Sequence, residues 1–328
     1  MQTQKKVGVI GAGAWGTAIS TVLVHNGHAI KLWCYEPEVA QEINQKHTNE
    51  RFLPGILLDH SIIASCDFSI VLKDAHYIAF AVPVLYARSI IQQIKPLLSH
   101  EIPWIILNKG IESTTLMLPS QIVYDVLGCN SYTVLSGPSF AGDLARKQIT
   151  ALDCAGTHPI IVKEVHELFE NKYCRITIKD DFYGIQVVGA LKNVIALASG
   201  LLEGADYSDN AKIFMIMQGM KELKKILMHY HGVQDTLYGL SGIGDIMLTA
   251  LCGRSRNRAC GFALGKGQPL QQVIKSAAGV VEGLNTLESL AQLSKKYSLD
   301  LPFFQGLHKI FFQGRAIDSW VQQQAQSL

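Results

Sequence analysis

Lys192 and its neighbours are the strongest candidate for acid–base chemistry in this chain. Lys192 and Asn193 are the polar members of Gly189–Ala196, whose other residues are small or apolar. A lysine ammonium in such surroundings must meet a partner or open into a cleft. Burial, together with cations such as Lys109 and Arg256, lowers the pKa of a lysine toward neutrality, where it can act as a general base. The pattern predicts that Lys192 removes a proton from a substrate hydroxyl.

A basic segment further along the chain is a candidate anion site. Gly253–Arg258 has the sequence Gly-Arg-Ser-Arg-Asn-Arg and precedes a predicted helix at Arg258–Lys266. Ser255 or Asn257 can cap this helix, and the arginines, Arg256 among them, can hold a phosphate in bidentate fashion. The alternative is a basic, solvated helix start without a ligand.

Two glycine-containing turns are further candidates. Leu240–Asp245 places two glycines beside a lone carboxylate, which indicates either a tight turn that presents Asp245 or a cap for the helix after it. Gly137-Pro138-Ser139 is either a turn whose serine caps the next helix or a set of backbone N–H donors for an anionic substrate. The sequence leaves both pairs of alternatives open.

Gly11, Gly13 and Gly16 form a G-x-G-x-x-G pattern between an apolar strand, Lys5–Ile10, and an apolar helical run, Thr17–Leu23. In this context the first glycine permits the tight turn, the second lets the backbone approach a pyrophosphate, and the third lets the helix pack on the strand. The phosphates then meet the unpaired N–H groups of the helix start, where the dipole is positive. The motif predicts that the chain binds a dinucleotide.

The elements around these residues change character near Phe182. Before it, near-continuous apolar runs of strand length are typical of a parallel sheet covered on both faces. After it, we find helical patterns only, which favours an all-helical second domain. The expected strands are Ala29–Trp33, Tyr77–Val82, Trp104–Leu107 and Tyr132–Leu135, with shorter ones at Thr150–Ala155 and Arg175–Thr177, and the later helices are Phe182–Leu202, Asn210–His231, Arg258–Lys266, Gly283–Tyr297 and Pro302–Phe312.

The expected fold is therefore α/β, with two domains. Residues 1–181 form a Rossmann-like, doubly wound, mostly parallel sheet that binds the dinucleotide, and residues 182–328 form an all-α substrate-binding and catalytic domain. Ligands of open parallel sheets bind outside the carboxyl ends of the strands. The loops after Val82, Leu107 and Leu135 should therefore face the cofactor.

Composition narrows the function classes. The 328 residues are 48% hydrophobic and carry a net charge of +2 with scattered Lys and Arg, so nucleic-acid binding is unsupported. The seven cysteines form no C-x-x-C pair and the histidines show no ligand spacing, so we expect no metal. No apolar run is expected to reach the length of a membrane span, and no signal peptide is evident, so a cytoplasmic protein is expected. The apolar helices favour a homodimer.

Taken together, these segments resemble the bacterial-type NAD(P)-dependent glycerol-3-phosphate dehydrogenases over nearly the whole chain. The resemblance implies reversible hydride transfer between sn-glycerol 3-phosphate and NAD(P), giving dihydroxyacetone phosphate and serving phospholipid synthesis. It is carried by the glycine turn with Trp15, Asn108–Glu112, Leu135–Ala141, Gly189–Val194, Gly244-Asp245, Ser255–Arg258 and Val280–Gly283.

The resemblance also implies roles for single residues. Lys192 matches the proton acceptor of the C2 hydroxyl and forms a catalytic set with Lys109 and Asp245, Lys109 touching both substrate and cofactor. The implied substrate contacts are Lys109, Gly137, Ser139, Lys192, Asp245, Ser255, Arg256 and Asn257. The implied cofactor contacts are Gly11, Gly13, Ala14, Trp15, Gly16, Tyr35, Lys109, Ala141, Arg256, Val280 and Glu282, with Ala14 standing where the family commonly has a serine.

Two questions remain open from the sequence. A related two-domain hydroxy-acid dehydrogenase and a non-catalytic dinucleotide sensor are the alternative functions. Glu36, about twenty residues after the glycines, is the acidic residue expected of NAD binders, whereas Arg51 could reach a 2′-phosphate. We expect both NADH and NADPH to be accepted, with NADPH used in the biosynthetic direction.

Overall fold

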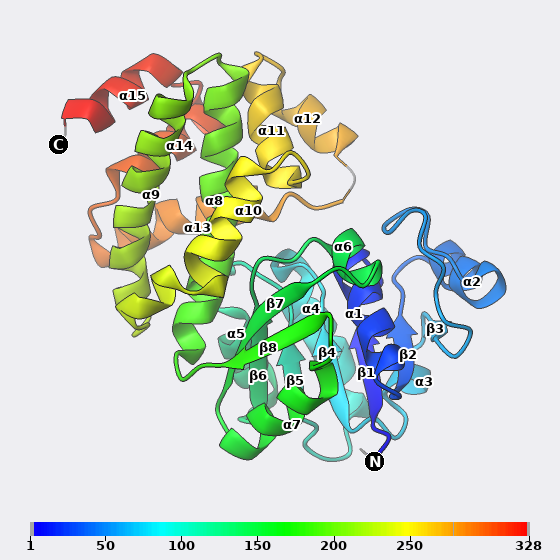
Figure 1. Cartoon of the computed structure of the whole chain (residues 1–328). Helices are drawn as coiled ribbons and strands as arrows, with labels where there is room; N and C mark the ends of the chain where they lie inside the picture. The colour runs from blue at the N-terminus through cyan, green and yellow to red at the C-terminus, as the bar shows by residue number, and fades with distance from the viewer. Residues whose placement is uncertain (1–2, 278, 327–328) are drawn as a thin grey trace. The chain divides into compact units, whose positions relative to one another are not determined.

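The computed structural model describes residues 3–277 and 279–326 and divides into two compact units (Figure 1). One unit comprises the described residues up to Asn108 together with Pro119–Phe182, and the other comprises Lys109–Leu118 and the chain from Tyr183 onward. The segment Lys109–Leu118 thus belongs to the helical unit, which differs from the contiguous division at residue 181 expected from the sequence. The reason is packing, because Ile111, Leu116 and Leu118 lie in the helical core.

The first unit is an eight-stranded sheet in the order β3-β2-β1-β4-β5-β6-β7-β8, in which every neighbouring pair is parallel except the antiparallel β6 and β7. The strand order reverses between β1 and β4, which is where such sheets bind ligands. The expected mostly parallel, doubly wound sheet is confirmed. The strands are β1 Lys6–Ile10, β2 Ala29–Trp33, β3 Ile63–Ser65, β4 Tyr77–Phe80, β5 Trp104–Ile106, β6 Tyr132–Ser136, β7 Thr150–Gly156 and β8 Cys174–Ile178.

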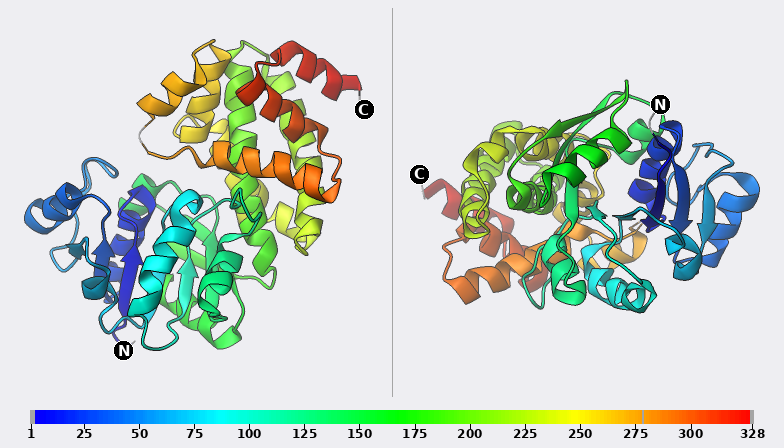
Figure 2. Two further views of the ribbon diagram at one scale, coloured as in Figure 1. Left: turned by 180° about the vertical axis from the view of Figure 1, so that it is seen from behind. Right: turned by 90° about the horizontal axis from the view of Figure 1, so that it is seen from below.

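Helices cover both faces of this sheet, as the two views of Figure 2 show. On one face α1 packs against α6 and α7, and on the other α4 packs against α5. Strand β3 was not expected from the sequence. It has three residues and its Ile63 is exposed, so no apolar run marks it. The helices are α1 Ala14–His25, α2 Pro37–Lys46, α3 Phe68–Leu72, α4 Val84–Ile94, the 3₁₀ turn η1 Lys95–Leu97, α5 Pro119–Leu127, α6 Ala141–Ala145 and α7 Pro159–Phe169.

The second unit is helical throughout its described residues and is built around α8 (Figure 1). The helices α12 and α15 were not expected from the sequence, because few of their side chains are buried. The elements are α8 Phe182–Gly204, α9 Asp209–His229, the 3₁₀ turn η2 Gln234–Tyr238, the π turn η3 Leu240–Gly244, α10 Asp245–Leu251, α11 Arg256–Gly265, α12 Leu270–Ser276, α13 Glu282–Tyr297, α14 Pro302–Gln313 and α15 Ile317–Gln326.

Helix α8 explains why the sequence around Lys192 is so apolar. Contrary to the expectation from the sequence, it is long and apolar enough to cross a membrane, but its most apolar stretch is completely buried inside the unit. A helix that is hydrophobic on all sides is the expected core of a helical domain. The polar residues on α8 therefore have to find partners inside the protein.

Helix α11 lies directly against α8 because glycines face backbone on both helices. A Cβ atom added to Gly200 of α8 would lie 1.9 Å from the Arg258 carbonyl oxygen, and one added to Gly261 of α11 would lie 2.0 Å from that of Leu197. No side chain fits at such distances, so this close approach requires glycine. The contact fixes the position of α11, whose first turn carries Ser255–Asn257.

We expect Gly200→Ala to push α11 away from α8. The added methyl group meets backbone rather than a flexible side chain, so the cost should reach or exceed the ~1–3 kcal/mol typical of overpacked sites. Urea unfolding measures this loss. The matched variant Gly267→Ala is informative as a control, because a Cβ there meets nothing within 4 Å and only its φ of +83° is unfavourable. Equal destabilisation by both variants would contradict the packing argument.

Candidate active site

The glycine turn lies at the carboxyl end of β1, and its three glycines serve different purposes. A Cβ on Gly16 would lie 1.9 Å from the Gly11 carbonyl oxygen, and one on Gly11, where φ is +112°, would lie 3.1 Å from the Ala81 backbone. A Cβ on Gly13 would meet nothing within 4 Å. Packing therefore requires the first and third glycines, whereas the second leaves open space at the start of α1.

The surroundings of this space suit a pyrophosphate group. No side chain caps α1 at Gly13, and its first turn contains no acidic residue, so the helix N–H groups are available to an anion. Asn49 donates hydrogen bonds to the Ala12 carbonyl and to Thr17 Oγ1, both at 2.9 Å, and so holds the turn in shape. Within the described residues, the buried Nε1 of Trp15 has no hydrogen-bond partner. These residues fit the dinucleotide that the motif predicts.

The other predicted residues of this unit share the same edge of the sheet. Tyr35 follows β2 and is 76% exposed. Gly137 and Ser139 lie between β6 and α6, and Ala141 is the first residue of α6. Ser139 does not cap that helix, which was one of the alternatives, because its hydroxyl donates to the Gly137 carbonyl at 3.0 Å. Parallel strands β1, β2 and β6 bring these loops to one edge.

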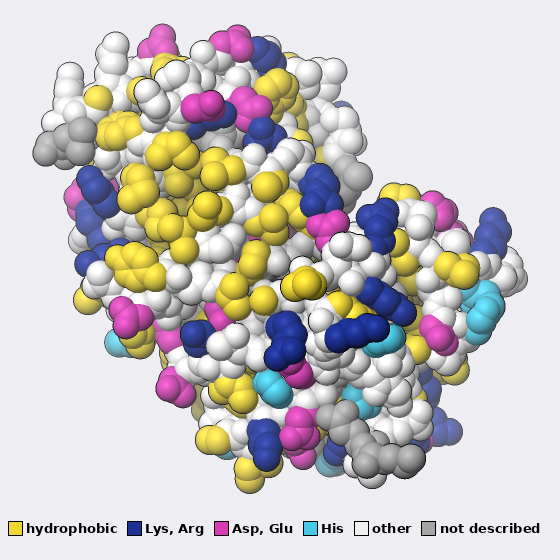
Figure 3. Space-filling view, in the orientation of Figure 1, with side chains coloured by type: hydrophobic (Ala, Val, Ile, Leu, Met, Phe, Trp, Pro, Cys, Tyr) yellow, Lys and Arg dark blue, Asp and Glu magenta, His cyan; other side chains and the backbone are white. Residues whose placement is uncertain are grey.

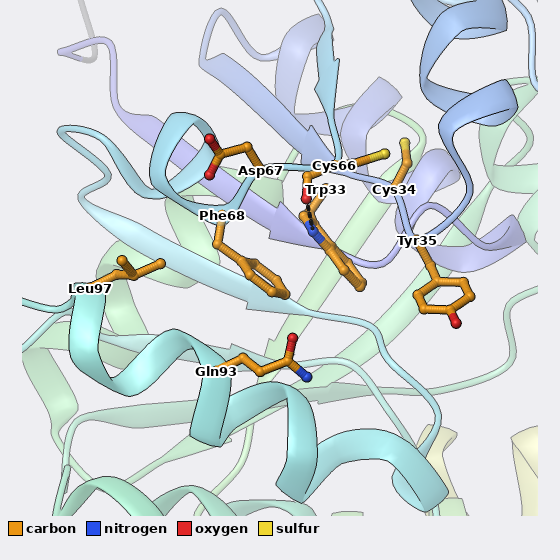
Figure 4. Close-up of a pocket in the computed structure, with 8 residues that line it drawn as sticks. All are labelled: Trp33, Cys34, Tyr35, Cys66, Asp67, Phe68, Gln93 and Leu97. Carbon is orange, nitrogen blue, oxygen red and sulfur yellow. Dashed lines mark hydrogen bonds between the residues drawn. The ribbon is translucent and has the colours of Figure 1, made fainter.

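An open cavity of about 600 Å³ lies at the carboxyl ends of β2 and β3 (Figure 4). The ring of Trp33 stacks on Phe68 at 4.5 Å and meets the edge of Tyr35 at 6.4 Å. The Gly11 amide donates to the Trp33 carbonyl at 3.2 Å, so this aromatic wall adjoins the glycine turn. The wall offers flat apolar surface of the kind on which a nucleobase stacks. The lining residues are Trp33, Cys34, Tyr35, Cys66, Asp67, Phe68, Gln93 and Leu97.

In the helical unit, two lysines share one buried carboxylate. Lys192 Nζ donates to Asp245 Oδ1 at 2.5 Å, and Lys109 Nζ donates to Asp245 Oδ2 at 2.8 Å. Lys192 also donates to Thr249 Oγ1 at 3.0 Å. Asp245 is completely buried, whereas the two lysine side chains keep 10% and 16% of their surface exposed. The arrangement fixes both ammonium groups and leaves each a path to solvent or substrate.

The electrostatics of this cluster favour proton transfer by Lys192. Burial lowers the pKa of Lys192 to about 8, with a further contribution from the charge of Lys109, while Asp245 opposes the shift. Burial by itself would raise the pKa of Asp245, but the two ammonium groups outweigh it and hold that pKa below its usual range. Asp245 therefore stays ionised near neutral pH, where Lys192 exchanges a proton readily.

Three separate segments supply this cluster. Lys192 comes from the core helix α8, Lys109 from the segment after β5, and Asp245 from the first turn of α10. The π turn before α10 needs Gly242, because a Cβ there would lie 2.3 Å from the carbonyl oxygens of Thr236 and Leu237. Gly244, not Asp245, is the N-cap residue of α10. The carboxylate thus binds the lysines rather than capping its helix.

The first turn of α11 is built from the residues predicted to hold a phosphate. Ser255 is the N-cap and accepts a hydrogen bond from the Arg258 amide at 3.2 Å, so it is Ser255 rather than Asn257 that caps. Asn257 donates to Asn193 Oδ1 and accepts from the Gly283 amide, both at 2.9 Å. Because Asn193 is the neighbour of Lys192, these hydrogen bonds tie the helix start to the segment of α8 that carries Lys192.

The charges around this helix start favour an anion. Arg256 is exposed, and Arg258 is paired with Glu203. Glu282, the first residue of α13, is half-buried; burial raises its pKa, and the charges of Arg256, Lys109 and Lys192 oppose the shift. Lys109, Lys192 and Arg256 thus face the carboxylates of Asp245 and Glu282. The formal charge of these groups together is +1, and it becomes more positive when Glu282 takes up a proton. Val280, predicted beside Glu282, is half-buried.

Thr249 belongs to this cluster although its sequence context did not predict it. Its hydroxyl accepts from Lys192 and donates to Asp245 Oδ1 at 3.2 Å. The only available signal was its spacing, since residues four apart on a helix share a face. Threonine is common enough on helices that this spacing alone identifies nothing.

Comparison with known proteins identifies the family of the chain. The family described as NAD-dependent glycerol-3-phosphate dehydrogenase matches residues 6–160 with its N-terminal part and 181–322 with its C-terminal part. A glycerol-3-phosphate dehydrogenase [NAD(P)+] of Lactobacillus delbrueckii subsp. bulgaricus is 39% identical over 95% of this chain and 94% of its own, and one of Bacillus velezensis is 36% identical over 97% and 93%. The crystal structure of the Coxiella burnetii glycerol-3-phosphate dehydrogenase has a TM-score of 0.95 at 29% identity, over 98% of this chain and 99% of that one. The chain belongs to the NAD-dependent glycerol-3-phosphate dehydrogenase family.

Proposed function

We propose that the chain interconverts sn-glycerol 3-phosphate and dihydroxyacetone phosphate, with NAD(P) as the hydride carrier and Lys192 as the general base and acid. The observation that carries this proposal is the buried Lys192–Asp245–Lys109 cluster, tied through Asn193 and Asn257 to a cationic helix start. One end of the site moves a proton and the other attracts a phosphate.

Lys192 performs the proton transfer at the substrate's C2 oxygen. In the oxidising direction neutral Lys192 accepts the hydroxyl proton, and in the reducing direction its ammonium form donates a proton to the developing alkoxide. The bound dinucleotide supplies the hydride acceptor or donor. Asp245 keeps the Lys192 side chain in one position through the 2.5 Å hydrogen bond, and Lys109 offers a second positive charge to the substrate oxygen.

The helix start at Ser255–Asn257 binds the substrate phosphate. A phosphate dianion needs cationic donors and helix N–H groups, and Arg256 and the first turn of α11 offer both. Because Asn257 is hydrogen-bonded to Asn193, the neighbour of Lys192, the distance from the bound phosphate to the Lys192 amine is held constant. We infer that this fixed distance selects the carbon next but one to the phosphate ester oxygen, which is C2.

Oxidation of reduced dinucleotide in the presence of dihydroxyacetone phosphate tests this function. We expect turnover that saturates with the phosphorylated ketone and falls by at least tenfold with unphosphorylated dihydroxyacetone, because the positively charged site at the start of α11 then has no anion to bind. Faster turnover with a 2-oxo acid would support the hydroxy-acid dehydrogenase instead. Dinucleotide binding without turnover of either substrate would support the non-catalytic sensor.

We also propose that the protein is a cytoplasmic homodimer that supplies glycerol 3-phosphate for phospholipid synthesis. Support for the dimer comes from hydrophobic side chains that gather over α9 in Figure 3, where Ile213 and Met217 are about half exposed. Such a patch suits burial against a second copy. Sedimentation equilibrium tests this assembly, and a monomer at micromolar concentration would contradict it.

A further inference from the structure

The charge at the end of β2 bears on which dinucleotide the chain selects. Glu36 lies twenty residues beyond Gly16 and is the N-cap residue of α2. Its side chain makes no capping hydrogen bond, so the helix N–H groups do not hold the carboxylate. In dinucleotide-binding sheets an acidic residue at this place accepts a hydrogen bond from the ribose 2′-hydroxyl, whereas a nearby arginine accommodates a 2′-phosphate. The question is therefore whether Arg51 can take the second role.

Arg51 is committed to acidic neighbours. Its Nη2 lies 3.6 Å from Glu36 Oε1, and its Nη1 lies 3.2 Å from Glu38 Oε1. The guanidinium also lies over the ring of Phe52, 5.0 Å from its centre. Arg51 is thus shared between two carboxylates and an aromatic face, and its charge is already balanced before any ligand arrives.

For the binding of a 2′-phosphate, the net charge of Glu36, Glu38 and Arg51 matters more than the ion pairs among them. Half-exposed pairs contribute little and rearrange readily, and the side chain of Arg51 is 54% exposed. Wherever that side chain turns, however, two carboxylates and one guanidinium leave a net charge of −1. A 2′-phosphate would add nearly two further negative charges to this group, which is unfavourable in every rotamer.

The negative charge extends to the cavity of Figure 4. Burial raises the pKa of Cys66, which lines that cavity, and the charges of Glu36 and Glu38 raise it further. Both carboxylates therefore act on the space beside the aromatic wall of Trp33 and Phe68. A nucleobase stacked there would bring its ribose to the same acidic surroundings.

We propose that Glu36 makes this chain select NAD(H) over NADP(H). The proposal rests on the proposed function, which places the adenosine half of the cofactor at the ends of β1 and β2. The Glu36 carboxylate accepts hydrogen bonds from the ribose hydroxyls of NAD(H) and repels the 2′-phosphate of NADP(H). This proposal replaces the expectation from the sequence that NADPH is used in the biosynthetic direction. The reason is that Arg51 is paired with Glu36 and Glu38 and does not form a phosphate site.

Isothermal titration calorimetry of the full chain with NADH and with NADPH tests this selection without relying on activity. We expect NADH to bind at least tenfold more tightly at low salt, and the ratio of the two dissociation constants to narrow as added salt screens the repulsion. Glu36→Gln should narrow that ratio by about tenfold, through tighter NADPH and weaker NADH binding. Asp74→Asn is the matched control, because it removes one exposed carboxylate of the same unit just before β4 begins.

The outcomes separate the two proposals. Wild-type NADPH binding as tight as that of NADH, or a ratio unchanged by Glu36→Gln, would overturn the selection while leaving the dehydrogenase intact. If neither dinucleotide binds, the cofactor site itself is wrong and the selection falls with it. Thermal unfolding of each variant shows whether it is folded at the temperature at which its dissociation constants are measured.

Discussion

Replacing Lys192 by methionine should lower turnover by roughly 10³–10⁴-fold, the upper part of the range for loss of a general acid–base group. Methionine keeps most of the volume in the buried helix α8 but has no ionisable group. Lys109 cannot substitute, because its ammonium is held by the other carboxylate oxygen of Asp245, at 2.8 Å. The dinucleotide should still bind, since the glycine turn belongs to the other unit.

Steady-state rates with dihydroxyacetone phosphate, together with calorimetric NADH binding, measure this effect. Lys225→Met is the matched control, because Lys225 is a half-exposed lysine of the helical unit that pairs with Asp300. The smaller variant Lys192→Ala leaves room for an added primary amine, which should restore part of the activity in proportion to the concentration of its ammonium form, the form that donates the proton in this reduction. Near-normal turnover in Lys192→Met would remove Lys192 from the mechanism, and failure of the amine would argue that the lysine only positions other groups.

Asp245→Asn should produce the second largest effect, a loss of about 10²-fold in turnover, because it frees Lys192 from its fixed position. It should also move the pH profile. In the wild type, oxidation of glycerol phosphate needs neutral Lys192 and should rise with pH through about 8, the pKa of that lysine. Asp245 favours the ammonium form, so its loss lowers the pKa of Lys192 and moves the rise to lower pH.

The pH profile of the reverse reaction should shift in the same direction. Reduction needs the ammonium form, so its rate should fall as pH increases through the same pKa, and Asp245→Asn should make it fall at lower pH. Values of kcat/KM measured against pH in both directions show the rise of the oxidation rate and the fall of the reduction rate. Asp206→Asn is the control, since Asp206 forms an exposed ion pair with Lys266 in the same unit. A profile identical to that of the wild type would mean that Asp245 does not set the charge state of Lys192.

The two variants also differ in stability. Asp245→Asn leaves two lysine ammonium groups close together without a carboxylate, and breaking a buried ion pair in this way typically costs ~3–5 kcal/mol. Lys192→Met leaves Asp245 paired with Lys109. Activities are therefore compared at temperatures where unfolding curves show each variant to be folded.

Features that depend on neighbours along the chain could be predicted from the amino-acid sequence. The glycine turn needs only a strand before it and a helix after it, and the structure places β1 and α1 there. Lys192 could be singled out because the segment around it is apolar on every side, which is typical of a core helix. The strand-to-helix change near Phe182 also follows from local patterns.

Only the tertiary structure decided which distant groups meet. Lys109 and Asp245 are 136 residues apart in sequence and 2.8 Å apart in space, and no periodicity relates them. The segment Lys109–Leu118 joined the helical unit because its apolar side chains are buried there. Thr249 became part of the site only through its bonds to Lys192 and Asp245.

The choice of capping residues was settled in the same way. Whether Ser255 or Asn257 caps α11, and whether Asp245 caps α10, depended on which hydrogen-bond partners packing brought within reach. Arg51 is an ordinary cation in the sequence and the partner of Glu36 and Glu38 in the fold. Residue type and spacing determine what a side chain can do, and long-range packing determines which of these interactions it makes, because charge and hydrogen bonding act over a few ångströms of space and not along the chain.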